Sequence, residues 1–287
     1  MKRGNIGGQA VLEGIMLRSP TQQALAVRTP DGKIVTEVSK LEPLAKRWPV
    51  FGLPLIRGGV AIFEALAGAI SSLERSAQLV EPDEEISSFH MAVITVIALL
   101  FGVGLFFLLP AVIVNPLSRW FGTTPLVLNL IEGLIRVLLF VGYLALIGLS
   151  RDIKRTFQYH GAEHKVISCW EAEKPLTPEA AATCSRLHPR CGTSFMLLVV
   201  VLSILLFTFF SPAILWQKLI LRLALLPVLA GIAYELTRWT AKSNSILARI
   251  VLAPGMSLQK LTTREPSLDQ LEVALAALAG VVDHGDE

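Results

Sequence analysis

Long apolar segments alternate with short polar ones between residues 89 and 240. Four of these segments contain few or no charged residues, and each exceeds the roughly 20 residues that a helix needs to cross a bilayer. They are residues 90–114, 125–149, 193–216 and about 218–239. This pattern predicts four transmembrane helices.

The first 88 residues show a shorter period. Two segments with partial alternation of apolar and polar residues, 23–30 and 33–39, flank the dipeptide Asp31-Gly32. Because Asp-Gly favours the tight turn of a β-hairpin, these segments predict two paired strands. Residues 7–17 supply a candidate third strand.

Two helices are predicted outside the four spans. Residues 58–78 are largely apolar, but Glu64 and several glycines interrupt them, which indicates an interfacial or re-entrant helix. Residues 266–282 place apolar side chains on one face behind a Ser267 cap, with Gln270 three residues later. This second pattern predicts a short amphipathic helix.

The expected fold class is mainly α: a polytopic α-helical membrane protein with a small N-terminal α+β region. Its expected parts are residues 1–88, a four-helix bundle at 89–240 that carries a polar loop at 150–192, and a C-terminal tail at 241–287.

Composition and charge support a membrane protein and predict its orientation. Only 17% of the residues are charged, against about 25% in soluble domains, and a net charge of +3 is too small to indicate nucleic acid binding. Lys and Arg number ten in residues 1–88, seven in 150–191 and four in 240–287, but only one and none in the two remaining loops. The positive-inside rule therefore places both termini and the central loop in the cytoplasm. Three cysteines without framework spacing fit that reducing side.

The central loop begins with a concentration of metal-binding side chains. His160, Glu163 and His164 form the order His-x-x-Glu-His. If the second span continues as one helix, the two histidines lie one turn apart and can hold one zinc ion. In inverzincin proteases, which share this order, the glutamate activates water. Two ordinary histidines are the alternative, and Gly161 weakens a continuous helix.

The end of the same loop offers two further ligands, His188 and Cys191. Both suit a borderline-soft cation such as zinc. A site that uses only one of them leaves a coordination position open, as in catalytic zinc sites, whereas a site that uses both is closed and structural. The alternative is a polar connector with inert cysteines.

Two glutamates are additional candidates for this site. Glu171 lies near the helix face of His164, and Glu235 lies near the end of the fourth span. For Glu235 we favour an ion pair with Arg238 at the membrane interface over a ligand role.

Charged residues also occur within the predicted spans, where Glu132 and Arg136 are one helical turn apart. An ionisable residue at membrane depth indicates a functional site by default. We favour the structural interpretation, in which the two neutralise each other or bind Arg222 of the fourth span.

The N-terminal segment contains Gln9 and Glu13 among glycines that follow neither the dinucleotide-binding nor the P-loop spacing. These two polar residues are candidates for the cytoplasmic site. A strand with glycines at bulges or turns is the alternative.

Four separated motifs resemble the YqhQ-like family of bacterial membrane proteins. They are "GGQAVLEGIMLRSP", "YHGAEHKVI", "HPRCGTSF" and "LQKLTTREPSLDQLEVALAAL". The resemblance covers nearly the whole chain, although "EGIMLRSP" stands where "EGVMMRGP" is expected. Because that family is described as predicted metal-dependent enzymes, the resemblance implies a bacterial inner-membrane protein with a divalent metal, but no reaction. The site residues that it implies are His160, Glu163, His164, His188 and Cys191, together with Gln9 and Glu13.

Three functional hypotheses follow. The leading one is a zinc-dependent hydrolase in which Glu163 is the general base, acting on a membrane-associated peptide or a lipid-linked molecule. The second is a non-enzymatic membrane scaffold with a structural metal site. The third is a small transporter that uses Glu132 and Arg136.

Overall fold

The N-terminal segment forms an antiparallel sheet in a computed structural model that describes residues 6–82, 88–121, 124–210, 214–243 and 245–282. Its strand order is β1-β2-β3-β4. The strands are β1 (Gly7–Val11), β2 (Gly14–Arg18), β3 (Gln22–Arg28) and β4 (Ile34–Lys40). The hairpin expected around Asp31-Gly32 is present as β3 and β4, and Gly32 has the positive φ of 83° that its turn requires. The single strand expected at 7–17 is two strands, because the chain turns at Leu12 and Glu13.

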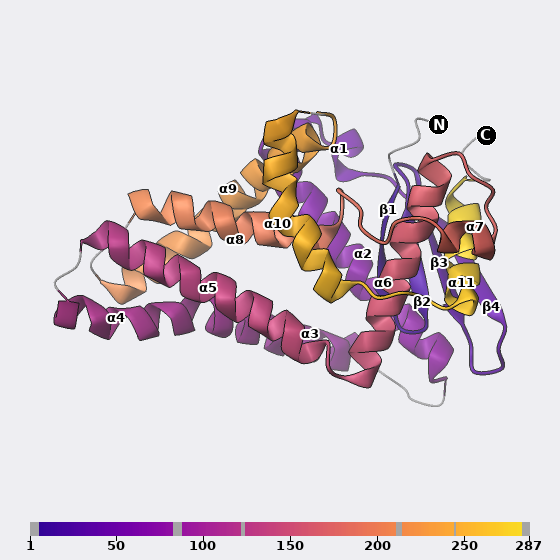
Figure 1. Cartoon of the computed structure of the whole chain (residues 1–287), viewed down its shortest axis with the longest axis horizontal. Coiled ribbons are helices and arrows are strands. Elements are labelled where there is room, and N and C mark those ends of the chain that lie inside the picture. The colour runs from indigo at the N-terminus through magenta and orange to yellow at the C-terminus, as the bar shows by residue number, and fades with distance from the viewer. Residues whose placement is uncertain (1–5, 83–87, 122–123, 211–213, 244, 283–287) are drawn as a thin grey trace.

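The rest of the described chain is mainly helical. The helices are α1 (Leu44–Arg47), η1 (Pro49–Gly52), α2 (Ile56–Val80), α3 (Ser88–Val103), the π-helix η2 (Gly104–Leu108), α4 (Leu109–Phe121), α5 (Pro125–Ile147), α6 (Arg151–Glu171), α7 (Pro178–Ala182), α8 (Gly192–Phe209), α9 (Leu215–Thr240), α10 (Ile246–Thr262) and α11 (Leu268–Val282). Figure 1 shows α3, α4, α5, α8 and α9 gathered lengthwise in one half of the molecule, and the sheet with α6, α7 and α11 in the other half.

Five of the described helices are long and apolar enough to cross a membrane. They are Ile56–Val80, Phe89–Val114, Leu126–Ile147, Gly192–Phe209 and Trp216–Thr240. Many of their large apolar side chains point outward; Ile97, Leu138 and Phe209 are each more than half exposed. So much exposed apolar surface is rare on a soluble protein, and it suggests a membrane protein.

Four of these five helices correspond to the four predicted spans, and α2 is the fifth. The second half of α2 lies against the sheet: the side-chain amide of Gln9 donates to the Ala69 carbonyl (3.2 Å), and that of Gln23 donates to the Ser72 hydroxyl (3.3 Å). The interfacial or re-entrant helix expected at residues 58–78 stays a prediction, because α2 is itself long and apolar enough to cross a membrane.

The second span does not continue into the motif helix. Helix α5 ends at Ile147, and α6 begins at Arg151 after a turn with Ser150 as its N-cap. The turn leaves α6 free to pack on the sheet, where Tyr159 and Val166 share a core with Ile15 and Leu17 of β2.

Helices α10 and α11 complete the fold. Helix α11 covers the same face of the sheet, and its capping box is formed as predicted: the Ser267 N–H donates to the Gln270 side chain (3.0 Å), and the Gln270 N–H donates to the Ser267 hydroxyl (3.3 Å). Helix α10 was not predicted. It begins after Ser245, whose hydroxyl accepts from the Ala248 N–H (3.2 Å).

Candidate metal centre

Three ligand atoms converge between α6 and the start of α8. They belong to His160, His164 and Cys191, and all three lie within 4.8 Å of one another. The Nε2 atom of His160 is 3.2 Å from the Cys191 sulfur. A tetrahedral zinc ion separates nitrogen and sulfur ligands by about 3.6 Å, so small movements would bring these atoms into its coordination sphere.

Main-chain carbonyls orient both imidazole rings. The Nδ1–H of His160 donates to the Thr262 carbonyl (2.8 Å), and the Nδ1–H of His164 donates to the Arg186 carbonyl (2.6 Å). A carbonyl only accepts, so in both rings Nδ1 carries a proton, and Nε2 is the atom that faces the Cys191 sulfur. Fixing a ring in this way is the usual support of a metal-binding histidine. Burial also lowers the pKa of His164, which favours the neutral form that binds metal.

Glu163 is buried beside these ligands. It lines a cavity of about 40 Å³ together with His160, His164 and Cys191. Burial raises the pKa of its carboxyl group, while the neighbouring His160 and His188 rings and the Gly8 backbone oppose that rise. Among the described residues its Oε2 atom has no hydrogen-bond partner. An unpartnered carboxylate oxygen is costly in such a place, and it is available to a water, a proton or an ion.

His188 and Glu171 lie next to the cluster but bind each other. The Nε2 atom of His188 is 3.2 Å from a Glu171 carboxylate oxygen, and Arg190 pairs with the other oxygen. The bond to His188 and the charge of Arg190 lower the pKa of Glu171. Of the two candidates for the third ligand, Cys191 is therefore in the cluster, whereas His188 lines the cavity without joining it.

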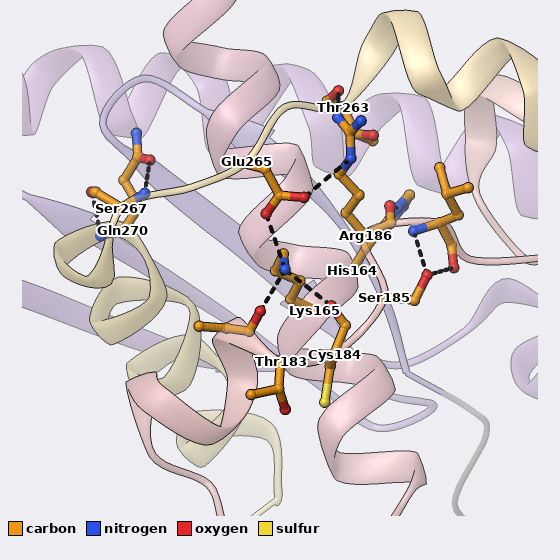
Figure 2. A network of polar contacts seen from close by, with 12 residues as sticks. His164, Lys165, Thr183, Cys184, Ser185, Arg186, Thr263, Glu265, Ser267 and Gln270 are labelled. Atoms are coloured by element: carbon orange, nitrogen blue, oxygen red, sulfur yellow. Dashed lines mark hydrogen bonds and ion pairs between the residues drawn. The ribbon is translucent and has the colours of Figure 1, made fainter.

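A buried lysine fixes the loop that orients His164. Figure 2 shows Lys165, whose Nζ donates to the carbonyls of Ala182 (2.7 Å) and Cys184 (3.0 Å) and pairs with Glu265 (3.0 Å). Glu265 also pairs with Arg186 (3.4 Å). The loop that supplies the carbonyl acceptor for His164 is therefore bound at two places, by Lys165 and by Glu265.

Residues 262–265, which we call the C-terminal strap, cross α6 at Gly161. The Arg264 N–H donates to the Phe157 carbonyl (2.9 Å), and a Cβ atom at Gly161 would lie 2.0 Å from the Arg264 carbonyl oxygen. Gly161 weakens helix propensity, but it lets the strap approach closely enough for Thr262 to accept from His160.

Three other candidates lie away from the cluster. Gln9 bonds to α2, and Glu13 pairs with Arg155 and accepts from the Tyr159 hydroxyl (3.2 Å). Glu235 forms a two-pronged pair with Arg57 of α2, both contacts 2.6 Å, so its partner is Arg57 rather than the expected Arg238.

The charged residues within the spans form one buried group. Glu132 binds both Arg136 (2.9 Å) and Arg222 of α9 (3.0 Å), and all three are about 95% buried or more. Arg136 also donates to the Ser203 hydroxyl (3.0 Å) of α8. These contacts join α5, α8 and α9, and they support the structural interpretation.

Several residues that matter to the centre were not singled out from the sequence. Gly8 borders Glu163: a Cβ atom there would lie 3.2 Å from its Oε1. Gln259 of α10 is fully buried and holds both backbone groups of His188 (2.8 and 2.7 Å). The Gly-Gly pair in the first motif was a usable signal for Gly8, whereas nothing local in the sequence indicates Gln259.

The chain is similar in sequence to proteins of unknown function. A family model described as "Protein of unknown function (DUF1385)" matches residues 53–284. The "Uncharacterized protein YqhQ" of Bacillus subtilis (strain 168) is 36% identical over 285 residues, covering 94% of this chain and 89% of that relative. No solved structure matches. Neither description mentions a metal or a reaction, so that part of the resemblance stays a prediction.

Proposed function

This chain belongs to the DUF1385 family of proteins of unknown function, and from that premise we propose that it is a zinc-dependent hydrolase of the membrane surface. The observation that carries the proposal is the convergence of three oriented ligands, His160, His164 and Cys191, beside the unpartnered carboxylate oxygen of Glu163. Three protein ligands leave one position of a tetrahedral ion open, which is the catalytic arrangement.

The donor set fits zinc. Imidazole and thiolate ligands suit a borderline-soft ion and do not suit magnesium or calcium, which prefer oxygen. Bound there, zinc would supply Lewis-acid polarisation of a carbonyl group or a water molecule.

The role of Glu163 is that of a general base. Its raised pKa, caused by burial, makes the carboxylate a stronger proton acceptor than an exposed one. Glu163 takes a proton from the water that attacks the carbonyl carbon and passes it to the leaving atom as the bond to that atom breaks. Gly8 borders the Oε1 atom of this carboxylate, and the Oε2 atom, which has no hydrogen-bond partner among the described residues, is open to the proton.

We also propose that four helices span the inner membrane, with α2 lying against the sheet, and that the sheet, α6 and both termini face the cytoplasm. The supporting observation is the concentration of Lys and Arg in the N-terminal and central loops. A reporter domain fused after Cys184 tests this orientation, and a periplasmic reading would contradict it.

Zinc analysis of the purified chain tests the metal centre. We expect about one zinc ion per chain and a sharp loss in His160→Ala and Cys191→Ser. His188→Ala and Cys184→Ser are matched controls outside the cluster and should keep the metal. A carefully prepared chain without zinc would refute the proposal.

Glu163→Gln separates the possible roles of the glutamate. If Glu163 is the base, this variant retains zinc and loses hydrolysis, whereas loss of zinc would make Glu163 a ligand. The small cavity favours a second candidate function, a structural zinc site in a membrane scaffold. In that case Glu163→Gln should leave the cellular phenotype intact.

A further inference from the structure

The free edge of the sheet runs directly into the candidate metal centre. β1 is an edge strand, because its only strand neighbour in the described part of the chain is β2. Gly7 and Gly8 of β1 are exposed, and both line the cavity of the metal centre. In Figure 1, β1 is the strand nearer to the membrane-length helices, and β4 is the far strand.

The pairing of the strands shows which backbone groups of β1 point outward. The Arg28 N–H donates to the Glu13 carbonyl, and the Ser19 N–H donates to the Gln22 carbonyl, so the odd-numbered residues of this stretch bond to β3. The even-numbered residues of β2 therefore bond to β1. They oppose Gly7, Gln9 and Val11, which leaves the N–H and carbonyl groups of Gly8 and Ala10 on the free edge.

Gly8 also borders the candidate metal centre. A Cβ atom at Gly8 would lie 3.2 Å from the Glu163 Oε1 atom. The Gly8 carbonyl and both backbone groups of Ala10 continue the edge away from Glu163. These backbone groups form a short row along the edge of β1. Glu163, the proposed general base, lies next to one end of the row.

We propose that the free edge of β1 binds an extended peptide segment, which adds to the sheet as a fifth strand and places a backbone amide at the metal centre. This inference rests on the proposed function. Main-chain bonding to a sheet edge is a common way to hold an extended peptide. The cavity of the candidate metal centre adjoins this edge, because Gly7 and Gly8 line it. Because β1 lies on the side of the membrane-length helices, the substrate is a segment of a protein next to the membrane.

The reaction is hydrolysis of an amide and needs only water as co-reactant. The water oxygen bonds to the carbonyl carbon, the carbon–nitrogen bond breaks, and Glu163 moves one proton from the water to the leaving nitrogen. A carboxylic acid and an amine result. The edge groups of Gly8 and Ala10 hold the chain on one side of the broken bond and take no part in proton transfer.

A proline on the free edge tests the inference. Ala10→Pro removes an outward N–H without removing a bond of the β1–β2 ladder, as proline on an edge strand allows. Thr36→Pro is the matched control, because Thr36 points outward on the opposite edge, β4, by the same alternation. The probe is fluorescein-labelled casein, an unstructured polypeptide, with the zinc-loaded full chain in detergent micelles.

We expect Ala10→Pro to lower casein hydrolysis by at least about threefold, the effect of one lost hydrogen bond, and Thr36→Pro to leave it unchanged. Zinc content and melting temperature are measured on both variants. Equal hydrolysis by Ala10→Pro and the parent would overturn the inference while leaving the metal centre intact. A zinc-loaded parent that does not cleave casein would overturn it too, whereas a chain without zinc would refute the proposed function itself.

Crosslinking provides a second test if Ala10→Pro fails to fold. A benzoylphenylalanine at position 7 has open space, because a Cβ atom at Gly7 meets nothing within 4 Å. In a Glu163→Gln background, which keeps the substrate uncut, this group should crosslink to casein, and the same group at position 36 should not. Equal crosslinking at both positions, or none at position 7, would contradict binding at β1.

Discussion

The Nε2 atom of His160 lies 3.2 Å from the sulfur of Cys191, although 31 residues separate them in the chain. His160 is in the middle of α6, and Cys191 is the N-cap residue of α8. The pair therefore couples the helix that packs on the sheet to a membrane-length helix, and any ion held there would be bound by both.

This proximity predicts that zinc protects the Cys191 thiol. In a Cys169→Ala, Cys184→Ala background, Cys191 is the only cysteine, and we expect iodoacetamide to modify it at least about tenfold more slowly with zinc than after chelation, because a coordinated thiolate is not free to attack. Mass spectrometry measures the rate. Adding His160→Ala should abolish the protection, and protection that survives this change would argue against a shared ion.

The background substitutions are suited to that experiment. Burial and the neighbouring Cys184 raise the pKa of Cys169 to about 11, so this thiol is inert near neutral pH. Neither Cys169 nor Cys184 belongs to the cluster.

A methyl group at Gly161 should displace the C-terminal strap. Gly161→Ala places a Cβ atom 2.0 Å from a backbone oxygen, and we expect a loss of about 1–3 kcal/mol in the free energy of unfolding, as overpacking typically causes. Gly142→Ala is the control, since its Cβ atom meets nothing within 4 Å. Thermal unfolding in detergent compares the two, and equal melting temperatures would contradict the close approach.

Substitution of Glu132 should lower the free energy of unfolding more than substitution of one of its two arginine partners. Glu132→Gln leaves two buried cations unpaired, and we expect a loss of at least about 3–5 kcal/mol in the free energy of unfolding. Arg222→Gln leaves Glu132 paired with Arg136, so its loss should be smaller. Denaturant unfolding in micelles measures which of the two variants loses more stability. A transport role predicts instead a loss of function at unchanged stability.

Glu171 should contribute to the acid sensitivity of the fold. Its pKa is lowered by His188 and Arg190, so the unfolded carboxylate binds protons at a higher pH than the folded one. The stabilisation is present above the ordinary pKa of 4.5 and is lost as the pH falls through the lowered value. The melting temperature should therefore fall less steeply below that pH in Glu171→Gln than in the parent. Parallel curves would show that the contacts of Glu171 do not persist in solution.

The sequence predicts the parts of this molecule that depend on local pattern. The apolar segments, the hairpin at Asp31-Gly32 and the capping box of α11 all depend on residues that are close in the chain. The grouping of His160, His164 and Cys191 was also foreseeable, because few residues of these types exist and they lie at the ends of consecutive spans.

Other features depend on contacts between distant segments. Such contacts have no local sequence pattern from which they could be predicted. The acceptor of His160 is the carbonyl of Thr262, and a carbonyl has no sequence signature. Glu235 could reach Arg238 by helical spacing, but the packing of α2 on α9 provides Arg57 at 2.6 Å instead. The continuous helix considered from the sequence is interrupted by the turn between α5 and α6, where Gly148 is the C-cap and Ser150 the N-cap.

The contact between His160 and Thr262 has a consequence for biosynthesis. These two residues are 102 positions apart, so the imidazole leaves the ribosome long before its acceptor is made. A nascent chain that ends after α8 holds all three ligands, but the carbonyl that fixes His160 is still missing. If the centre binds zinc as proposed, the oriented imidazole that it needs is complete only after translation of α10, and a prematurely terminated chain lacks it.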